Sequence, residues 1–303
     1  SRTNREHNIQ LLLLDWEKAF DKVDQEALFE AMERMNIDDK LIRLTKQLYK
    51  NPRFKVEMGH QESDWKTQHT GIRQGCTLSP YLFLIIMTAI MHDTREDRDL
   101  EEELYENRPP NHDFDEVLYA DDTIIFSTNT PTLQKYLSKI EEVAAAYGLS
   151  LNKKKCEELN TNPKVANKLK FKDGTKVRQK SEAKHLGCKL NNKADIEKEI
   201  TMRLSQCKVI WKRLENFWKH SNTTKRTKLH VYDAVVKPKL LYGLDTANVT
   251  DGQLKRLDAF QLKGLRQILK IETTWAQKKH GKEMTNKTEQ VYELAARKLH
   301  PRD

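Results

Sequence analysis

The stretch EVLYADDTIIF, residues 116 to 126, sets two adjacent carboxylates, Asp121 and Asp122, between two apolar runs. Short runs rich in Val, Leu, Ile and Phe on both sides of a polar pair are typical of two strands joined by a tight turn. Asp is common in solvated turns, so a plain turn is one interpretation. Because two like charges at one hairpin tip repel each other, a site that binds a divalent cation through carboxylate oxygens is the other.

A metal site at this hairpin needs a further carboxylate from a neighbouring strand. Residues 10 to 14, QLLLL, form a short apolar run that predicts a buried strand, and Asp15 follows it directly. Asp15 is therefore the candidate third carboxylate of a two-metal site, in which the cations lie roughly 3.5 to 4 Å apart. An Asp that ends a buried strand is also a common helix cap, and the residues alone leave both interpretations open.

The segment 24 to 70 has the pattern of a helical insertion followed by a hairpin. Helical spacing from Asp24 to about Lys50 predicts two helices, the second of which begins at the cap residue Asp38. The apolar face expected for this second helix consists of Leu41, Leu44 and Leu48. RFKVEMG, residues 53 to 59, alternates as a strand and is expected to turn back through HQESD.

Helices are also expected on both sides of the 116 to 126 hairpin. Ser79 and Pro80 together predict the start of a buried helix over 81 to 92, with Ser79 as its N-cap. The segment 93 to 116 holds 11 Asp and Glu residues and is expected to be an exposed loop. Thr130 and Pro131 repeat the start signal, for a helix that Gly148 ends.

The pattern changes after residue 150. FKDGTKV, residues 171 to 177, predicts a hairpin with a DG turn, and KHLGCKL, residues 184 to 190, predicts another short strand. From about Ala194 the chain is nearly all helix, so a domain boundary is expected near residue 191. Helices are expected over 195–219, 223–236 and 251–270, the last capped by Thr250 or Asp251. The polar tail after Thr273 is expected to be partly disordered before VYELAARKL.

The charge of the chain is uneven. The formal net charge is +9 in 303 residues, but residues 161 to 240 contain 21 Lys and Arg against 7 Asp and Glu, a local net of +14. The rest of the chain is therefore at about −5. A field of that sign favours a polyanion, most often nucleic acid, because binding releases counterions from the phosphates. A solvated Lys-rich helical surface is the plain alternative.

Cysteine usage and hydropathy limit the class of protein further. The four cysteines form no CxxC pair and no zinc pattern, which favours a reduced, intracellular protein. The longest apolar stretch, YLFLIIMTAIM at 81 to 91, is too short to span a bilayer, so no membrane partner is expected. No secretory signal precedes the strand at 10 to 14, and this abrupt start suggests a fragment of a longer protein.

Five blocks of the sequence occur in the order found in a known enzyme family. They are LLDWEKAFDKV (13–23), GIRQGCTLSPYLF (71–83), YADD (119–122), GLSLNKKK (148–155) and HLG (185–187). Their order and gaps resemble the palm motifs of reverse transcriptases. The residues of these blocks, together with the thumb-like stretch KPKLLYGLD…LKRLDAFQLKGLRQILKI at 237 to 271, are most similar to the non-LTR, LINE-type retrotransposon branch. The resemblance covers residues 10 to 271.

This resemblance implies an α+β fold, the right-hand polymerase palm with partial fingers followed by an all-α thumb. The palm and partial fingers would occupy residues 1–190, with the fingers-like insertion at about 24–70. The thumb would occupy 191–273, and 274–303 would be a C-terminal tail. Aromatic residues of the thumb (Trp211, Phe217 and Trp218) are expected to lie in helix cores, while its Lys and Arg residues follow the nucleic-acid backbone.

The resemblance also implies the catalytic groups. Asp15 and Asp121 would bind two Mg²⁺ ions, for which Mn²⁺ can substitute, with help from Asp122 and the backbone carbonyl of Trp16. The ions would activate a primer 3′-hydroxyl for attack on the α-phosphate of a dNTP. Lys155 aligns with the family lysine that protonates the leaving pyrophosphate as a general acid. A solvated lysine run is the plain alternative for Lys155.

Further residues are implied to contact nucleotide, template and primer. Phe20 matches the aromatic residue that excludes a ribose 2′-hydroxyl, with simple core packing as the alternative, and its neighbour Asp21 is expected to be a cap or turn residue. The loop that touches template and incoming nucleotide is matched by Arg73, Gln74 and Gly75. The primer-grip turn is matched by His185, Leu186 and Gly187, with His185 standing where the family commonly has an aromatic residue.

The implied function is the RNA-directed DNA polymerase core of a retroelement protein, acting on an RNA template, a DNA primer or target and dNTPs. Its expected location is intracellular, in the nucleus at the site of integration. Finger strands with basic residues that grip the triphosphate are missing before the first block, so the alternative is a truncated, non-catalytic nucleic-acid-binding remnant. An intron maturase or an RNA-dependent RNA polymerase is a third interpretation. Phe20 argues against ribonucleotide use, and the LINE-like thumb argues against the intron branch.

Overall fold

The computed structural model describes residues 8–162, 169–193, 195–245, 247–280 and 287–299. The chain divides into two compact units, Ser1–Lys193 and Ala194–Asp303. This division lies close to the boundary expected from the sequence near residue 191. Each unit has its own buried apolar cluster, so each is described separately below.

The first unit is built on a five-stranded sheet with the strand order β6-β7-β1-β8-β9. Neighbouring strands of this sheet pair antiparallel, except β8 and β9, which are parallel. The central strand β1 is the apolar run QLLLL, because packed elements cover both faces of the sheet and so bury both faces of this strand. The strand bounds are β1 Gln10–Leu14, β6 Glu116–Tyr119, β7 Asp122–Ser127, β8 Glu157–Asn160 and β9 Arg178–Lys180.

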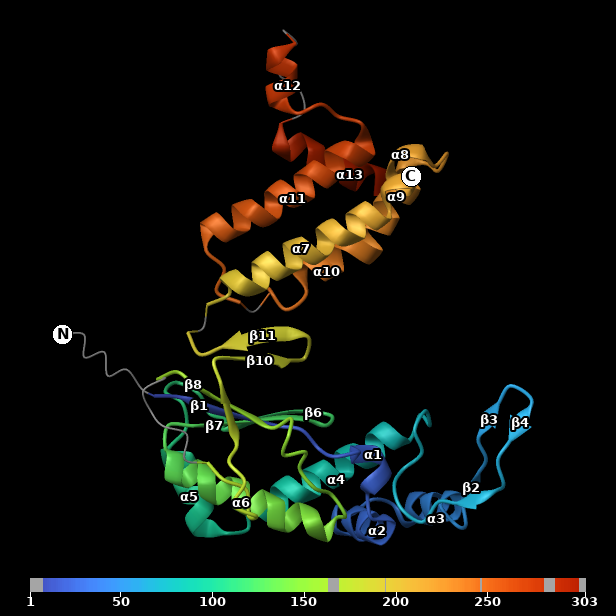
Figure 1. Ribbon diagram of the computed structural model, residues 1–303, viewed down its shortest axis with the longest axis vertical. Helices are drawn as coiled ribbons and strands as arrows, with labels where there is room; N and C mark the ends of the chain where they lie inside the picture. Colours follow the sequence, from blue (N-terminus) through green and yellow to red (C-terminus); the bar gives the residue numbers. More distant parts are fainter. Residues whose placement is uncertain (1–7, 163–168, 194, 246, 281–286, 300–303) are drawn as a thin grey trace, which may run out of the picture. The chain divides into compact units, whose positions relative to one another are not determined.

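Helices cover one face of this sheet, as Figure 1 shows for α4 and α6. The alternation of β1 sends Leu12 and Leu14 into the large cluster with these helices, while Leu13 faces the opposite side. The helices are α1 Ala19–Lys22, α2 Gln25–Arg34, α3 Asp39–Leu48, α4 Ser79–Thr94, α5 Arg98–Glu106 and α6 Thr130–Ala146.

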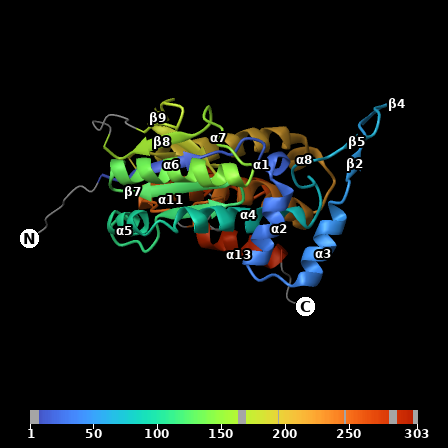
Figure 2. The same ribbon diagram turned by 90° about the horizontal axis from the view of Figure 1, so that it is seen from below.

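A β-hairpin covers the other face of the sheet. It pairs β10 (Glu182–His185) with β11 (Cys188–Asn191), and Ala183 of β10 joins Leu13, Ile124 and Leu159 in a small apolar cluster. Two further short ladders extend from the end of α3, as seen in Figure 2. They pair β2 Arg53–Phe54 with β5 Lys66–Thr67, and β3 Glu57–Met58 with β4 Gln61–Glu62.

The second unit is all helical around a core that includes Trp218, Tyr232 and Leu265. A capping box between Thr250 and Gln253 starts its longest helix, as the sequence predicts for Thr250. Its helices are α7 Glu197–Arg213, α8 Glu215–His220, α9 Lys225–Val231, the π-helical turn η1 Tyr232–Val236, α10 Lys237–Leu241, α11 Asp251–Leu269, α12 Thr274–Lys279 and α13 Thr288–Leu299.

Several local expectations are wrong. The acidic segment 93–116 contains α5, because Leu100 and Leu104 supply a buried face. On α3, Ile42 and Thr45 are buried, whereas the expected core residues Leu41, Leu44 and Leu48 are about half exposed. Ser79 is not the N-cap of α4, because it is already the first residue of the helix and Leu78 stands at the cap. The Ser79 hydroxyl donates instead to the Arg73 carbonyl in the preceding loop.

The tail beyond Thr273 is expected to be partly disordered before VYELAARKL, yet α12 forms over Thr274–Lys279, and residues 281–286 lie outside the described residues. The VYELAARKL stretch lies in α13, which buries Val291 and Ala295 in the core of the second unit. Asn129, and not Thr130, caps α6, because its side chain accepts from the Thr132 N–H. None of the described helices combines the length and the hydropathy of a bilayer-spanning segment.

Candidate active site

The pairing of β1 with β7 brings the conspicuous carboxylates to one end of the sheet. Leu14 pairs with Thr123, so Asp15, which follows Leu14, and Asp122, which precedes Thr123, lie at the same end of adjacent strands. On the other side of β7, Tyr119 pairs with Asp122. Residues 120 and 121 therefore form a two-residue turn, with Asp121 exposed at its tip.

The backbone of this turn is strained. Ala120 has φ +54°, a conformation that two-residue hairpin turns require and that non-glycine residues seldom adopt. Left-handed backbone at a residue with a side chain costs on the order of 1–3 kcal/mol and persists only where the surrounding structure imposes it. The pairing of β6 with β7 imposes this conformation and sets Asp121 next to Asp122 at the end of the hairpin.

Asp15 is held by its backbone and leaves part of its carboxylate unused. Its N–H donates to the Cys156 sulfur at 3.4 Å, and its carbonyl accepts from Asn152 N–H at 2.7 Å. Carboxylate atom Oδ2 lies 3.5 Å from Lys155 Nζ. Atom Oδ1 is shielded from solvent and accepts no hydrogen bond from the described residues. A shielded carboxylate oxygen without a donor is costly in itself and suits a cation ligand.

The three aspartates fit a hard divalent cation by donor type, since all offer oxygen atoms. They are not gathered tightly: among the described residues, only His92, Asp93 and Glu96 place three such ligand atoms within 4.8 Å of one another. That other cluster is an ion-pair network, because Arg34 binds the Asp93 carboxylate and Tyr147 donates to it. A guanidinium at its centre opposes a second cation.

Trp16 follows Asp15 and turns the chain away from the sheet. Its backbone bridges to Leu151, and its buried indole N–H donates to the Thr123 hydroxyl at 3.4 Å. Trp16 therefore links the segment after β1, the start of β7 and the segment before β8. Its backbone lies beside the carboxylates that the sequence singles out.

The lysine run 153–155 separates into different roles. Lys153 Nζ contacts Asp173 at 2.7 Å and lies over the Phe171 ring, so it stays on the surface of the DG hairpin. Lys155 is instead the lysine beside Asp15. The turn before β8 thus directs Lys155 to the carboxylates and Lys153 away from them, a choice that the sequence pattern leaves open.

Phe20 lies half-buried at the edge of the helical layer. Its ring stacks on Phe83 of α4, with ring centroids 4.8 Å apart and planes inclined by 17°. The Phe20 carbonyl accepts from Ile72 N–H at 2.7 Å. Phe20 is therefore both packed against the core and adjacent to the loop that precedes α4.

That loop, residues 70 to 78, is clamped to the turn that follows Phe20. Gly71 N–H donates to the Val23 carbonyl at 2.7 Å, and the Gln25 amide donates to the Gly71 carbonyl at 2.9 Å. Gly71 has φ +82°, and a Cβ here would lie 2.6 Å from the Asp21 carbonyl oxygen. Only glycine allows this approach of the two backbones.

The three loop residues that the sequence assigns to nucleotide and template contact differ in their exposure and partners. Arg73 donates to the Leu48 carbonyl at 2.8 Å and lies over the Tyr49 ring, so its guanidinium covers the C-terminal end of α3. Gln74 and Gly75 are exposed. The Gln74 amide donates to Asp21 Oδ1 at 2.9 Å. Asp21 therefore positions a residue of the candidate site, a contact missed in the sequence because the two residues are 53 positions apart.

His185, Leu186 and Gly187 form the tip of the β10–β11 hairpin. His185 pairs with Cys188, and the two residues between them have φ +47° and +78°, as a tight two-residue turn requires. Burial lowers the pKa of His185, and the charge of Asp122 acts in the opposite direction. His185 is thus near enough to the YADD hairpin to sense its charge.

Comparison with known proteins supplies the family. The family described as "Reverse transcriptase (RNA-dependent DNA polymerase)" matches residues 2–190. The Pol polyprotein of the type-1 retrotransposable element R2 from Nasonia vitripennis is 26% identical over 162 residues, which are 51% of this chain and 14% of that protein. The polymerase of the mobile element jockey from Drosophila funebris is 25% identical over 271 residues, 84% of this chain and 28% of that protein.

One solved structure supports the fold. A telomerase from Candida tropicalis, in complex with a fragment of telomeric RNA, superposes with a TM-score of 0.50 at 14% identity, covering 98% of this chain and 50% of that one. This chain spans less than a third of the R2 and jockey proteins, and the telomerase likeness concerns the fold alone. The family match covers more than half of the sequence, and with the R2 and jockey relatives it confirms the resemblance: this chain belongs to the reverse transcriptases, in the branch of non-LTR retrotransposons.

Proposed function

We propose that this chain is the catalytic core of an RNA-directed DNA polymerase, which extends a DNA primer with dNTPs on an RNA template. The observation that carries the proposal is the placement of Asp15 and Asp122 at one end of paired strands, with Asp121 on the adjoining turn. Oδ1 of Asp15 is shielded from solvent and accepts no hydrogen bond from the described residues, so it is available as a cation ligand.

Asp15, Asp121, Asp122 and the backbone carbonyl of Trp16 are the groups that would hold two divalent cations. Mg²⁺ is the proposed ion, with Mn²⁺ as a substitute, because all these ligands are hard oxygen donors. When bound, such ions supply Lewis-acid activation of a hydroxyl and neutralise a leaving phosphate. The protein contributes the strand register and the tight turn at Ala120, which together bring the three aspartates to one end of the sheet.

Lys155 is the proposed proton donor to the leaving pyrophosphate. Its ammonium lies 3.5 Å from Asp15 Oδ2, and two-thirds of its side chain is exposed, so it can leave this loose contact when a phosphate group enters. Ion pairs as exposed as this one contribute little to stability. A proton held on Lys155 Nζ would then be available next to the carboxylates.

The segment 70–78 and Phe20 are the proposed nucleotide pocket. Gln74 and Gly75 are exposed on a loop whose backbone is fixed to residues 20–25, so they are available to an incoming nucleotide and its template base. Phe20 is backed by Phe83, so a ribose 2′-hydroxyl could not displace its ring easily. Arg73 would have to release the end of α3 before it could contact a phosphate.

The hairpin tip at His185, Leu186 and Gly187 is the proposed primer grip, since it reaches the YADD turn from the opposite face of the sheet. We also propose that the protein acts inside the cell, in the nucleus where its DNA primer lies. That location follows from the substrates proposed and has to be tested by imaging of the tagged protein.

Primer extension tests this function. With Mg²⁺ or Mn²⁺, the chain should extend a DNA primer on an RNA template, and Asp121→Asn should abolish extension. Asp113→Asn, which changes an exposed aspartate of the loop before β6, is the matched control and should keep full activity. No extension with either ion, alongside salt-sensitive RNA binding, would instead establish the alternative, a non-catalytic nucleic-acid-binding remnant.

A further inference from the structure

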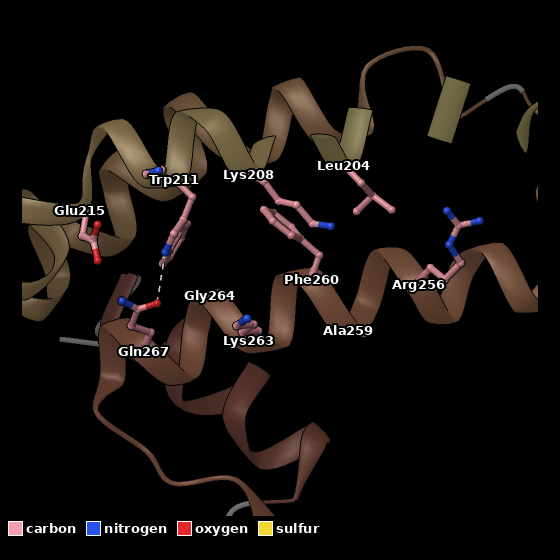
Figure 3. A pocket seen from close by; sticks show the side chains of 11 residues that line it. Leu204, Lys208, Trp211, Glu215, Arg256, Ala259, Phe260, Lys263, Gly264 and Gln267 are labelled. Carbon is pink, nitrogen blue, oxygen red and sulfur yellow. Dashed lines mark hydrogen bonds between the residues drawn. The ribbon is translucent and has the colours of Figure 1, made fainter. Parts of the chain in front are cut away.

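The second unit contains a pocket that the proposed chemistry does not use. It has a volume of about 710 Å³ and lies between α7 and α11, entirely within that unit. Figure 3 shows Leu204, Lys208 and Trp211 reaching from α7 toward α11, and Phe260 and Arg256 reaching back from α11. Leu204 and Glu215 lie 11 residues apart, so the groove runs along about three helical turns.

The floor of the groove is apolar and partly aromatic. Phe260 and Trp211 are half-buried against the core, and Leu204 and Ala259 lie beside them. Gly264 lets the Trp211 ring pack directly on the backbone of α11, because a Cβ there would lie 3.0 Å from that ring. Trp211 is fixed in place, since its N–H donates to Gln267 Oε1 at 3.1 Å and its ring stacks on Trp218.

The rim of the groove is basic. Lys208, Lys212 and Lys263 line it, are exposed and form no ion pair within the described residues of the unit. The acidic side chain at its end, Glu215, is already paired with Lys219, and Arg256 is paired with Glu197. Three ammonium groups without an ion-pair partner among the described residues surround an apolar floor. Such a groove suits a ligand that places anionic groups on the rim and an apolar, flat group on the floor.

We propose that this groove binds a short single-stranded nucleic-acid segment, with unpaired bases against Phe260 and Trp211 and phosphates on the three lysines. A duplex hides its bases in the stack and offers only its backbone to such a surface, whereas a single strand offers flat bases and phosphates together. The inference rests on the proposed polymerase function, which supplies a single-stranded template. An acidic amphipathic helix is the competing occupant, decided by the test below.

Fluorescence anisotropy on the full chain tests the proposal, in EDTA and without dNTP, so that catalysis is not required. A labelled 12-nucleotide single-stranded RNA is the probe. Lys263→Glu should weaken binding by on the order of tenfold and lower the salt dependence. Lys255→Glu carries the same charge change on α11 outside the groove, and it should have a smaller effect.

The floor is tested separately. Ala259→Glu puts a carboxylate into the groove at an exposed helical position, and Ala259→Gln fills the same space without charge; both should weaken binding, the first more strongly. An abasic strand of the same length keeps the phosphates, and wild type should bind it at least about fivefold more weakly than the RNA. Circular dichroism of each variant checks that its helices remain folded.

Opposite results would overturn the proposal. One is an equal loss of RNA affinity in Lys255→Glu and Lys263→Glu, and another is equal affinity of wild type for the abasic strand and the RNA. A third is that an acidic Leu/Glu-rich helical peptide binds in a Lys263-dependent way and RNA does not displace it. Asp121→Asn should leave groove binding unchanged. Failure of primer extension with groove binding intact would therefore count against the polymerase function alone.

Discussion

Phe20 combines core packing with the position proposed for sugar selection. Its ring stacks on Phe83, which the core of the first unit buries, while Phe20 itself stays half-buried beside the loop at 70–78. A side chain supported from behind cannot retreat from a bulkier sugar. Core packing and sugar selection are therefore compatible for this residue.

Replacing Phe20 by Val should admit ribonucleotides. The smaller side chain leaves space for a 2′-hydroxyl, and we expect the ratio of ribonucleotide to deoxynucleotide incorporation to rise by about tenfold or more. Single-nucleotide incorporation with a dNTP and the matching rNTP measures this ratio. Phe83→Leu removes the support behind the ring and should raise the same ratio by a smaller factor. Unchanged selectivity in Phe20→Val would mean that the ring is only a core residue.

At the scale of elements, a charged network holds the strand that leads to the YADD turn. Asp115, 2% exposed, pairs with Arg95 from the end of α4 and with Arg108 at 3.0 Å, and its carbonyl accepts from Phe126 N–H. Glu116 contacts Arg95 at 3.2 Å and accepts from the buried Tyr136 hydroxyl. These contacts fix the register of the edge strand β6 and so the position of Asp121.

Asp115→Asn should destabilise the first unit by about 3 kcal/mol, because it takes the carboxylate partner from the partly buried guanidinium of Arg108 and leaves Arg95 to Glu101 and Glu116. Chemical denaturation measures the change in the free energy of unfolding. Glu101→Gln is the matched control: Glu101 also pairs with Arg95, at 2.8 Å, but it is 41% exposed, and the loss should be below about 1 kcal/mol. Equal losses would show that the buried network does not hold the hairpin.

The ion pair between α2 and α4 gives a pH dependence. Arg34, helped by Tyr147, holds the pKa of Asp93 down to about 2 from 3.8. A lowered carboxyl pKa adds stability that is present above about pH 4 and is lost as the pH falls toward about 2. Arg34 is half exposed, so we expect about 1 kcal/mol. Wild type should unfold less readily than Asp93→Asn at pH 6, and this difference should shrink at pH 3; a constant difference would contradict the assignment.

At the scale of the whole molecule, the chain consists of two units with separate cores. Because the second unit buries its own set of residues, including Tyr232, Leu265 and Val291, we expect residues 194–303 to fold alone. Circular dichroism with a urea titration should show a cooperative transition of a helical fragment. A fragment that stops at residue 273 lacks α13 and should be less stable, and equal stability would mean that α13 does not belong to the core.

The sequence predicts the elements with strong local signals well. β1, the YADD hairpin and α6 follow from apolar runs, a turn and the buried face from Leu133 to Ala144. It fails where tertiary contacts decide: α5 looks acidic and loop-like until Leu100 and Leu104 meet α6. Local pattern also cannot show that Arg73 covers α3, or that Asp21 holds Gln74, because these partners are distant in the chain.

The most direct measurement of the central claim is single-turnover addition of one dNTP to a DNA primer on an RNA template. Rate and template affinity are measured together for wild type, Asp15→Asn, Asp121→Asn and the Asp113→Asn control. The proposed role of the carboxylates predicts that the first two variants lose on the order of a thousandfold in rate while their affinity for the template stays the same. An unchanged rate in Asp121→Asn would contradict it.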